Sequence, residues 1–377
     1  MKIALVSPYD FASPGGVVSH ISCLEQQFTR MGHDVKIIAP ASRAVYTIGD
    51  RFIRIGTPRA IPVSGSIARI TLSLRIESQI KEVFAREKFD ICHLHEPLMP
   101  TLCTTVLRLK LCPTVGTFHA SGGRGWYTMF TPVMKWYFDR WFRKLDGRIA
   151  VSEIAHKYVA PFFPADYTII PNGVDTKHFT NSVSPLDNYN DGKSNILFVG
   201  RLEKRKGFDY LLEAYRMIKP EFPESRLIQV GPGVMLRKKY QRFIDRNGIP
   251  DVIFAGYSTY NDLPRYYKSA DIACFPSTGR ESQGIVLLEA MSVGKPVIAS
   301  NIDGYNSVLT DGAEGIAVPP RRPEDLAKAL TRLLKNKPLR QQMGARGIAR
   351  AKDYEWSTIA SKLVDFYQDA LNKIKRV

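Results

Sequence analysis

Residues 272–289 read IACFPSTGRESQGIVLLE, and this stretch of the sequence decides the fold. Four apolar residues, Ile272–Phe275, form a run of the length that is typical of a buried parallel strand. A loop that contains Pro276 and Gly279 follows, and an apolar helix begins near Gly284. A buried strand that leads through a loop into a helix is the repeating unit of a doubly wound α/β domain.

The same alternation of short apolar runs and helical patterns recurs along nearly all of the 377 residues. Near the N-terminus, a strand at Ile3–Val6 is followed by the loop Pro8–Gly16 and by a helix that stops at Gly32. That helix carries one apolar face at steps of three and four residues: Val17, Ile21, Leu24, Phe28 and Met31. Further strands are predicted at Val35–Ile38, Ile91–Leu94, Thr114–Thr117, Gly147–Val151, Ile196–Val199, Arg226–Val230, Val252–Ala255, Pro296–Ala299 and Gly315–Val318.

This organisation predicts two Rossmann-like, doubly wound domains in tandem, over residues 1–170 and 171–355. The C-terminal helix, within residues 356–377, is free to pack back on the N-terminal domain. A polar stretch rich in Asn, Asp and Ser, Asn181–Ser194, is the best candidate for a linker.

Charge and cysteine usage limit the function classes. The formal net charge is +17, which indicates a polyanionic partner: nucleic acid, anionic lipid or a phosphorylated substrate. The five cysteines are odd in number and form no C-x-x-C pair, so neither a disulfide framework nor a zinc site is expected. The sequence contains no signal peptide and no apolar run near the ~18 residues of a membrane span. We therefore expect a cytoplasmic protein.

Two loops that follow predicted strands suggest phosphate chemistry. The glycines of Pro14–Val17 lie where a helix begins, so a backbone approach to phosphate and a structural turn are both compatible with them. The loop Gly200–Gly207 reads GRLEKRKG, and its Arg201 and Lys206 are suited to hold a diphosphate. The alternative for this loop is an exposed basic turn.

The stretch quoted first carries the third motif. Glu281 lies in the loop at the carboxyl end of a strand, and Glu289 lies one to two helical turns further, where it could approach a ribose. Between the two acids, the N–H groups near Gly284 and Ile285 face the position expected for phosphate.

These motifs together resemble the retaining glycosyltransferases of family 4. The matching residues are Glu281-x7-Glu289, Arg201-x4-Lys206, PNGVD at 171–175 and VIFAG at 252–256. The resemblance covers nearly the whole chain and implies the GT-B fold, in which two Rossmann-like domains face a deep interdomain cleft. It implies an acceptor domain at the N-terminus and a nucleotide-sugar domain at the C-terminus. The N-terminal half is similar to the phosphatidylinositol mannosyltransferase branch of that family, through residues 7–9, 14–17, 19–20, 65–69, 95–97 and 117–121.

The resemblance implies a role for each matching position. The catalytic residues it implies are His119, Glu281, Arg201 and Lys206. The donor would be bound by Gly16, Arg201, Arg205, Lys206, Ser258, Thr259, Tyr260, Glu281, Ser282, Gly284, Ile285 and Glu289. Tyr9 and Arg69 would meet the acceptor head group, together with the positions of Val18, Val63 and Ser64. At these last three positions, and at Gln283, the sequence departs from the family pattern.

The expected function is transfer of a hexose, mannose from GDP-mannose, to a phosphatidylinositol-like or other lipid acceptor at the cytoplasmic face of the cell membrane. No cofactor or metal is expected, because the sequence lacks the Asp-x-Asp that would hold a divalent cation at the diphosphate. One alternative is a UDP-hexose-dependent glucosyltransferase acting on diacylglycerol or another glycan or lipid acceptor. Another is a sugar-nucleotide binder without activity. A nucleic-acid-binding protein is suggested by charge alone, so nucleic acid is not an expected partner.

Two further features stay open at this point. His93 and His95 have strand spacing and are either metal ligands or, as we favour, residues of a strand at the core edge. Arg124–Arg148 combines Trp126, Trp136 and Trp141 with basic residues, which suits either an anionic membrane surface or the core side of an amphipathic helix.

Overall fold

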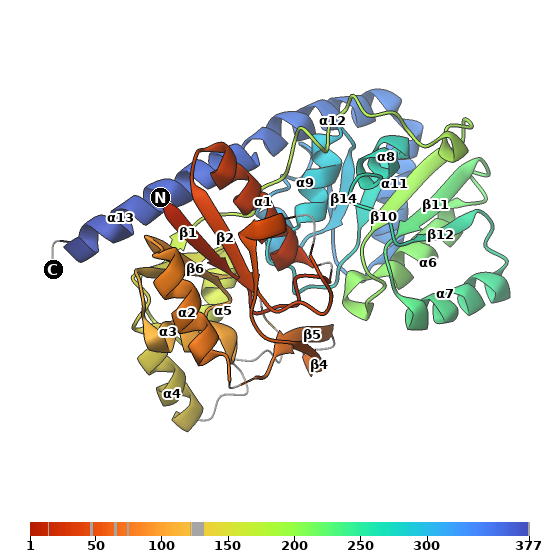
Figure 1. The fold of residues 1–377 in the computed structure, drawn as a ribbon. Coiled ribbons are helices and arrows are strands. Elements are labelled where there is room, and N and C mark those ends of the chain that lie inside the picture. The colour runs from red at the N-terminus through yellow and green to blue at the C-terminus, as the bar shows by residue number, and fades with distance from the viewer. Residues whose placement is uncertain are drawn as a thin grey trace. The chain divides into compact units, whose positions relative to one another are not determined.

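The computed structural model describes residues 1–13, 15–45, 48–63, 66–73, 75–120, 122 and 132–375. The chain folds into two compact units (Figure 1). Unit 1 comprises Met1–Asn172 and Trp356–Val377, and unit 2 comprises Gly173–Glu355. Each unit is built on a parallel sheet, which confirms the prediction of two Rossmann-like folds.

The described strands of unit 1 form a seven-stranded parallel sheet in the order β3-β2-β1-β6-β7-β8-β9. Their bounds are β1 Lys2–Val6, β2 Asp34–Ala39, β3 Phe52–Arg54, β6 Ile91–His95, β7 Thr114–Phe118, β8 Gly147–Ala150 and β9 Thr168–Ile169. The order reverses at β1, so the carboxyl ends of β1 and β6 flank a topological switch point, where ligands bind in open α/β sheets. An antiparallel hairpin that the sequence analysis did not predict, β4 (Pro58–Val63) with β5 (Ser66–Thr71), is separate from this sheet.

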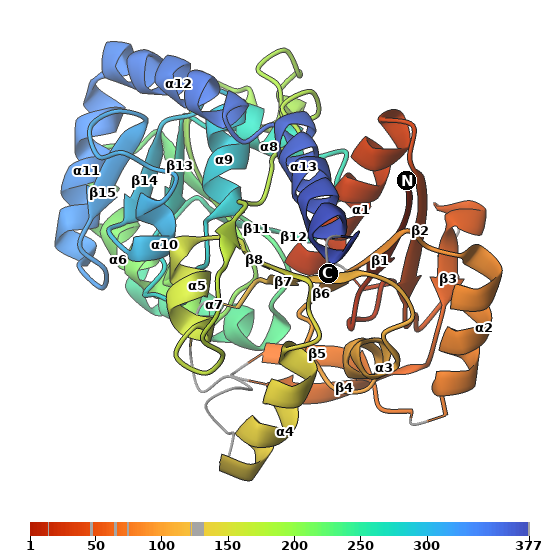
Figure 2. The same cartoon turned by 90° about the vertical axis from the view of Figure 1, so that its left-hand side faces the viewer.

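Helices cover both faces of the unit 1 sheet (Figure 2). α1 (Gly16–Arg30) and α13 (Trp356–Lys375) pack together on one face through apolar side chains that include Phe28 and Tyr367. α2 (Glu77–Glu87), α3 (Leu102–Leu109), α4 (Pro132–Phe142) and α5 (Glu153–Val159) contribute to the core on the other face. A Cβ at Gly147 in β8 would lie 2.6 Å from the ring of Phe366 in α13, so only glycine allows this close approach. The last helix therefore belongs to the core of unit 1.

Unit 2 repeats the plan with a six-stranded parallel sheet in the order β12-β11-β10-β13-β14-β15. Its strands are β10 Ser194–Val199, β11 Ser225–Val230, β12 Val252–Gly256, β13 Ile272–Phe275, β14 Val297–Ser300 and β15 Gly315–Val318. Its helices are α6 Phe208–Ile218, α7 Val234–Asn247, α8 Leu263–Ser269, α9 Ile285–Ser292, α10 Asp303–Asn306, α11 Pro323–Lys335 and α12 Lys337–Lys352. The order reverses at β10, so the loops after β10 and β13, which hold Arg201 and Glu281, meet at a second switch point.

Two details of the sequence analysis were wrong. Residues 181–194 are not a linker, because they lie inside unit 2, where the Leu186 N–H donates to Ser269 Oγ at 2.8 Å and Asp191 pairs with Arg226. Their polar groups bond within the unit, so polarity alone was a poor indicator of a boundary. Met31 does not belong to the apolar face of α1, because the helix ends at Arg30 and the Met31 side chain is exposed.

Candidate functional site

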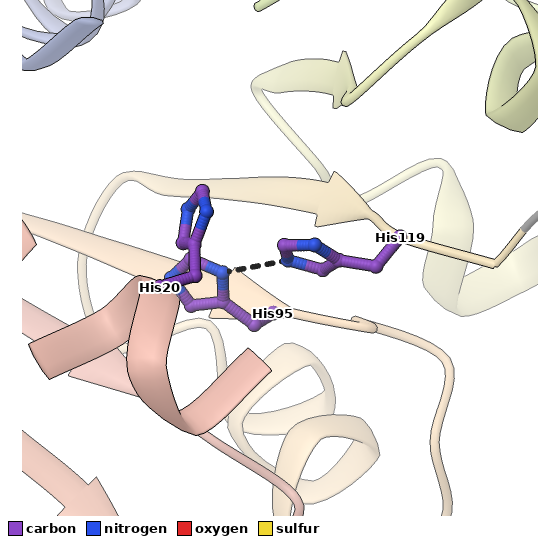
Figure 3. Close-up of side chains that lie close together, drawn as sticks. All are labelled: His20, His95 and His119. Carbon is purple, nitrogen blue, oxygen red and sulfur yellow. Dashed lines mark hydrogen bonds between the residues drawn. The ribbon is translucent and has the colours of Figure 1, made fainter. Parts of the chain in front are cut away.

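Three histidines meet at the carboxyl edge of the unit 1 sheet (Figure 3). His95 is the last residue of β6, His119 directly follows β7, and His20 comes from α1. His95 Nδ1 and His119 Nε2 are 3.1 Å apart, and the ring centre of His20 lies 4.9 Å from that of His119. Of these three, the sequence analysis assigned a catalytic role to His119 alone, and the structure places two more imidazoles beside it.

All three imidazoles are neutral near pH 7. Burial lowers the pKa of His20 to about 4. Burial and, to a lesser extent, the neighbouring histidines lower the pKa of His95 and of His119 well below 6.5. Because a neutral imidazole offers one donor and one acceptor nitrogen, His119 can hydrogen-bond an uncharged hydroxyl.

Glu96 anchors the loop that carries His119. Its Oε1 accepts hydrogen bonds from the backbone N–H groups of His119, at 2.7 Å, and Ala120, at 2.9 Å. Glu96 is buried and has a left-handed backbone with φ of +52°, a conformation that non-glycine residues adopt rarely. The carboxylate at this strained position therefore fixes the start of the loop after β7.

His93 has a structural role, which answers for this residue the first question left open by the sequence. Its side chain is buried, with Nδ1 2.6 Å from the hydroxyl of Tyr367 and Nε2 2.6 Å from the hydroxyl of Thr117. Both ring nitrogens are thus used within the core. The preferred interpretation, a core strand rather than a metal pair of His93 and His95, fits this position.

Two of the predicted acceptor residues lie together in unit 1. Tyr9 follows β1 and forms an isolated bridge to Ile70 of the hairpin. Burial, and then the charge of Glu96, raise the pKa of Tyr9 well above 10, so its hydroxyl stays protonated. The adjacent Asp10 N–H donates to the carbonyl of Arg69 at 2.8 Å, while the Arg69 side chain is exposed.

The structure does not bring the other predicted residues of unit 1 into contact with Tyr9 or Arg69 among the contacts described. Val18, on α1, packs against the apolar cluster that α1 and α13 share. Val63 is the last residue of β4, and Ser64 lies outside the described residues. Gly16 is the first residue of α1 and is exposed, and a Cβ there would meet nothing within 4 Å among the described residues.

Glu281 is the centre of a charged cluster in unit 2. Its Oε1 lies 2.7 Å from Lys206 Nζ and 2.8 Å from an Arg205 guanidinium nitrogen, and it accepts a hydrogen bond from Ser277 Oγ at 3.0 Å. Burial raises the pKa of Glu281, but Lys206 and Arg205 outweigh burial and hold it below the usual range. Glu281 is therefore an ionised acceptor that two cations keep in place.

Arg201 lies beside this cluster. A guanidinium nitrogen of Arg201 is 3.0 Å from Glu203, which also accepts a hydrogen bond from Arg205 at 2.9 Å. The Arg201 side chain is 54% exposed, whereas that of Lys206 is only 16% exposed. The exposed guanidinium of Arg201 and the partly buried ammonium of Lys206 thus lie at the same sheet edge.

The start of α9 separates the two acids. Gly284 precedes Ile285, the first residue of α9, and has φ of +81°; a Cβ there would lie 2.6 Å from the ring of Tyr305. The N-cap residue Gly284 has no side chain to bond the first N–H groups of α9, and a helix start of this kind suits an anion. Ser282 and Ile285 are partly exposed at the same place.

Glu289 lies in the last turns of α9 and has a different environment from Glu281. It accepts a hydrogen bond from the buried Tyr267 hydroxyl at 2.7 Å. Burial raises the pKa of Glu289 to about 7. This carboxyl is thus half-ionised near neutral pH.

The predicted base-binding residues follow β12. Tyr260 stacks on His178 with ring centres 4.0 Å apart and an angle of 5° between the rings, and His178 Nε2 donates to the Tyr260 carbonyl at 2.8 Å. Thr259 donates its hydroxyl to Asp262 at 2.6 Å, and Ser258 is partly exposed beside them. Sequence reasoning missed His178, for which no motif gave a signal.

Sequence reasoning also missed Glu96 and Ser277, although both residues follow buried strands at the carboxyl edge of a sheet. That position is itself a signal, because the carboxyl ends of parallel strands gather side chains at one edge.

Comparison with known proteins agrees with this geometry. Residues 14–178 match the family model described as Glycosyltransferase Family 4, and residues 187–350 match the model described as Glycosyl transferases group 1. The chain is 36% identical over 376 residues to phosphatidyl-myo-inositol mannosyltransferase of Mycobacterium tuberculosis, covering 98% of this chain and 97% of that protein. The Mycobacterium leprae protein of the same name is 35% identical over 98% of this chain and 96% of its own. The chain belongs to glycosyltransferase family 4.

The fold of this family-4 member is GT-B, as two solved structures also show. A sucrose-phosphate synthase from Thermosynechococcus elongatus aligns with a TM-score of 0.79 at 21% identity, covering 99% of both chains. Anabaena HepE in complex with UDP aligns with a TM-score of 0.78 at 19% identity, covering 98% of this chain and all of that one. The protein is thus a glycosyltransferase enzyme, and the predicted family, fold and enzyme class are confirmed.

Proposed function

We propose that this enzyme transfers mannose from GDP-mannose, with retention of configuration, to phosphatidylinositol or a similar lipid. The observation that carries the proposal is the Glu281 cluster, in which an ionised carboxylate is held by Lys206 and Arg205 beside the open N-terminus of α9. The mannose and the acceptor come from the relatives that are 35–36% identical over nearly the whole chain and are named phosphatidyl-myo-inositol mannosyltransferases.

The cluster suits a nucleoside diphosphate leaving group. In this proposal Lys206 and Arg201 stabilise the negative charge that grows on the diphosphate as the sugar bond breaks. The free N–H groups of α9 add a partial positive charge at the same edge. We propose that these groups do the work a divalent metal does in other transferases, so that no metal is required at the diphosphate.

The remaining residues divide between the two substrates. Glu281 accepts hydrogen bonds from hydroxyls of the transferred sugar, and Glu289 accepts them from the ribose. The neutral imidazole of His119 bonds a hydroxyl next to the reacting carbon. On the acceptor side, the exposed guanidinium of Arg69, beside Tyr9, is suited to the phosphodiester of a lipid head group.

The second feature left open, Arg124–Arg148, contributes a surface as well as core. Residues 124–131 lie outside the described residues. In α4, Phe138 and Trp141 are buried, while Trp136 is 68% and Tyr137 46% exposed next to the exposed Lys135. We propose that this aromatic and basic face of α4 lies on anionic lipid at the cytoplasmic surface of the membrane. None of the described helices is long and apolar enough to span a bilayer.

The test is transfer by purified protein to vesicles that contain phosphatidylinositol, with GDP-mannose as donor. We expect a mannosylated inositol lipid with the α configuration, and no product from Glu281→Ala. Parallel reactions combine UDP-glucose with phosphatidylinositol and GDP-mannose with diacylglycerol. Preference for UDP-glucose, or mannosylation of diacylglycerol alone, would reject the proposed donor or acceptor. Full activity of Glu281→Ala would reject the site.

A further inference from the structure

The histidines around His119 have unused ligand atoms. Among the described residues, His20, His95 and His119 each offer a nitrogen that lies within 4.8 Å of the others. His20 Nε2 and His95 Nε2 are buried and find no hydrogen-bond partner in the described part of the chain. Since buried polar atoms are nearly always bonded, the unpartnered Nε2 of His20, one of the three clustered imidazoles, indicates a ligand. His95 faces His119 through its other nitrogen, Nδ1, and would bind the same ligand through that atom.

The surroundings resemble the outer shell of a metal site. His20 donates from Nδ1 to Asn172 Oδ1 at 2.8 Å, which leaves its lone pair on Nε2, as outer-shell amides and carboxylates do for metal-binding histidines. The buried side chain of Glu96 accepts a hydrogen bond from the backbone N–H of His119 and so fixes the residue that carries this imidazole. His119 is partly exposed, so an ion can enter from its side.

The spacing fits a tetrahedral ion. Two imidazole nitrogens on tetrahedral zinc stand about 3.3 Å apart, given Zn–N bonds of 2.0–2.1 Å. The 3.1 Å between His95 Nδ1 and His119 Nε2 is close to this value. One of these two nitrogens carries the hydrogen atom of their hydrogen bond. When the ion binds, that hydrogen moves to the other nitrogen of the same imidazole ring, so that both facing nitrogens can bind the metal. The His20 ring then closes in by about 1.5 Å to reach the same ion.

We propose that His20, His95 and His119 bind one Zn²⁺ or a similar divalent transition metal, and that the bound ion inhibits sugar transfer. Three neutral imidazoles select zinc, nickel, copper or cobalt over the hard ions Mg²⁺ and Ca²⁺. The inhibition rests on the proposed function, because an imidazole of His119 that coordinates a metal no longer bonds the transferred sugar. The binding of the metal does not rest on it.

The binding test uses the full-length protein after treatment with EDTA, titrated with Co²⁺ and followed by the visible absorption of tetrahedral cobalt. We expect one Co²⁺ per chain, displaced by Zn²⁺ and not by Mg²⁺. His20→Gln and His95→Gln should each weaken binding by at least tenfold, and Asn172→Ala, which removes the outer-shell bond to His20 Nδ1, by about tenfold. His156→Gln is the matched control, because His156 is a partly exposed histidine on α5 outside the cluster.

Two results would overturn the site: no tetrahedral cobalt spectrum, or a spectrum that all three cluster variants retain. Because His95 lies in the core, its replacement could unfold the protein, so circular dichroism of each metal-free variant is measured first. If His95→Gln is unfolded, the cobalt spectra of His20→Gln and Asn172→Ala still test the site.

The second measurement adds micromolar Zn²⁺ to the transfer assay. We expect inhibition that EDTA reverses and that Asn172→Ala shifts to about tenfold higher zinc. Cobalt binding without any transfer activity would contradict the proposed function alone. Transfer that zinc leaves unchanged, in a protein that binds cobalt, would contradict the inhibition alone.

Discussion

The switch points of the two units present opposite chemistry on the same scaffold. In unit 2, the loops after β10 and β13 bring together cations and an ionised carboxylate, Glu281. In unit 1, the loops after β6 and β7 bring together imidazoles that burial keeps neutral. The difference fits the proposed function, in which unit 2 holds the charged diphosphate and the histidines of unit 1 face uncharged hydroxyls.

The largest expected effect comes from removing the charge of the unit 2 site. We expect Glu281→Gln to lower kcat by about 10²–10³-fold, because the variant loses the ionised acceptor and leaves Lys206 and Arg205 without their carboxylate. The measurement is steady-state transfer at saturating donor. Glu221→Gln is the matched control, since Glu221 pairs with Lys335 at the surface of the same unit and should change kcat by less than twofold. A kcat loss below tenfold for Glu281→Gln would remove this residue from the reaction.

The same contrast explains how much the sequence could predict. The charged cluster of unit 2 lies within two loops: Arg201 and Lys206 are five residues apart in one, and Glu281 stands four residues before Ile285, the first residue of α9, in the other. Short-range spacing therefore carried the prediction. The parallel strands and the helices between them followed from apolar runs and helical periodicity, which local sequence also determines.

The unit 1 site was harder to predict, because its parts come from distant segments. His20, His95 and His119 belong to different elements, and Asn172 follows β9 at the end of the first segment of this unit. Their meeting depends on strand order, which no local pattern specifies. The β4–β5 hairpin was also not predicted from the sequence. Its strands read PRAIPV and SIARIT, and the first contains prolines, which local patterns associate with loops.

The second effect concerns the anchor in unit 1. We expect Glu96→Ala to lower kcat by roughly 30-fold with little change in the donor KM, because two backbone N–H groups lose a charged acceptor and the His119 loop is no longer fixed. Glu96→Gln keeps an acceptor oxygen and should restore most of the activity. A merely structural role would lower the melting temperature of both variants and leave kcat of the folded fraction unchanged. Glu153→Gln, at an exposed position of unit 1, is the control.

A third prediction uses the one acid of unit 2 that burial keeps partly neutral. Because the pKa of Glu289 is about 7, its carboxylate forms between pH 6 and 8. Ionised Glu289 accepts hydrogen bonds from ribose hydroxyls better than the neutral acid, so affinity for GDP should rise about tenfold over this range. Calorimetric titration of Glu289→Gln with GDP should give an affinity that is independent of pH. A pH-dependent affinity in the variant would assign the titration to another group.

The same shift predicts an effect on stability. The pKa of Glu289 in the folded protein lies above its ordinary value of 4.5, so the folded state loses stability as pH rises from 4.5 through 7. Glu289→Gln removes this penalty, which amounts to up to about 3 kcal/mol. The variant should therefore gain melting temperature relative to the original protein at pH 8, and less at pH 5. An equal difference at both pH values would contradict the buried, half-ionised state of Glu289.

The smallest expected effect tests which unit carries the membrane-binding surface. Replacing Trp136 and Tyr137 of α4 together by alanine should weaken co-sedimentation with anionic vesicles about fivefold, because partly exposed aromatic rings insert at the lipid interface. The matched control is Met235→Ala in α7 of unit 2, an apolar side chain that is 89% exposed on a helix that is also basic. If charge alone held the protein on the membrane, neither substitution would weaken binding and added salt would release both proteins. If α7 rather than α4 meets the lipid, the Met235 variant would show the larger loss, and the membrane-facing surface would belong to unit 2.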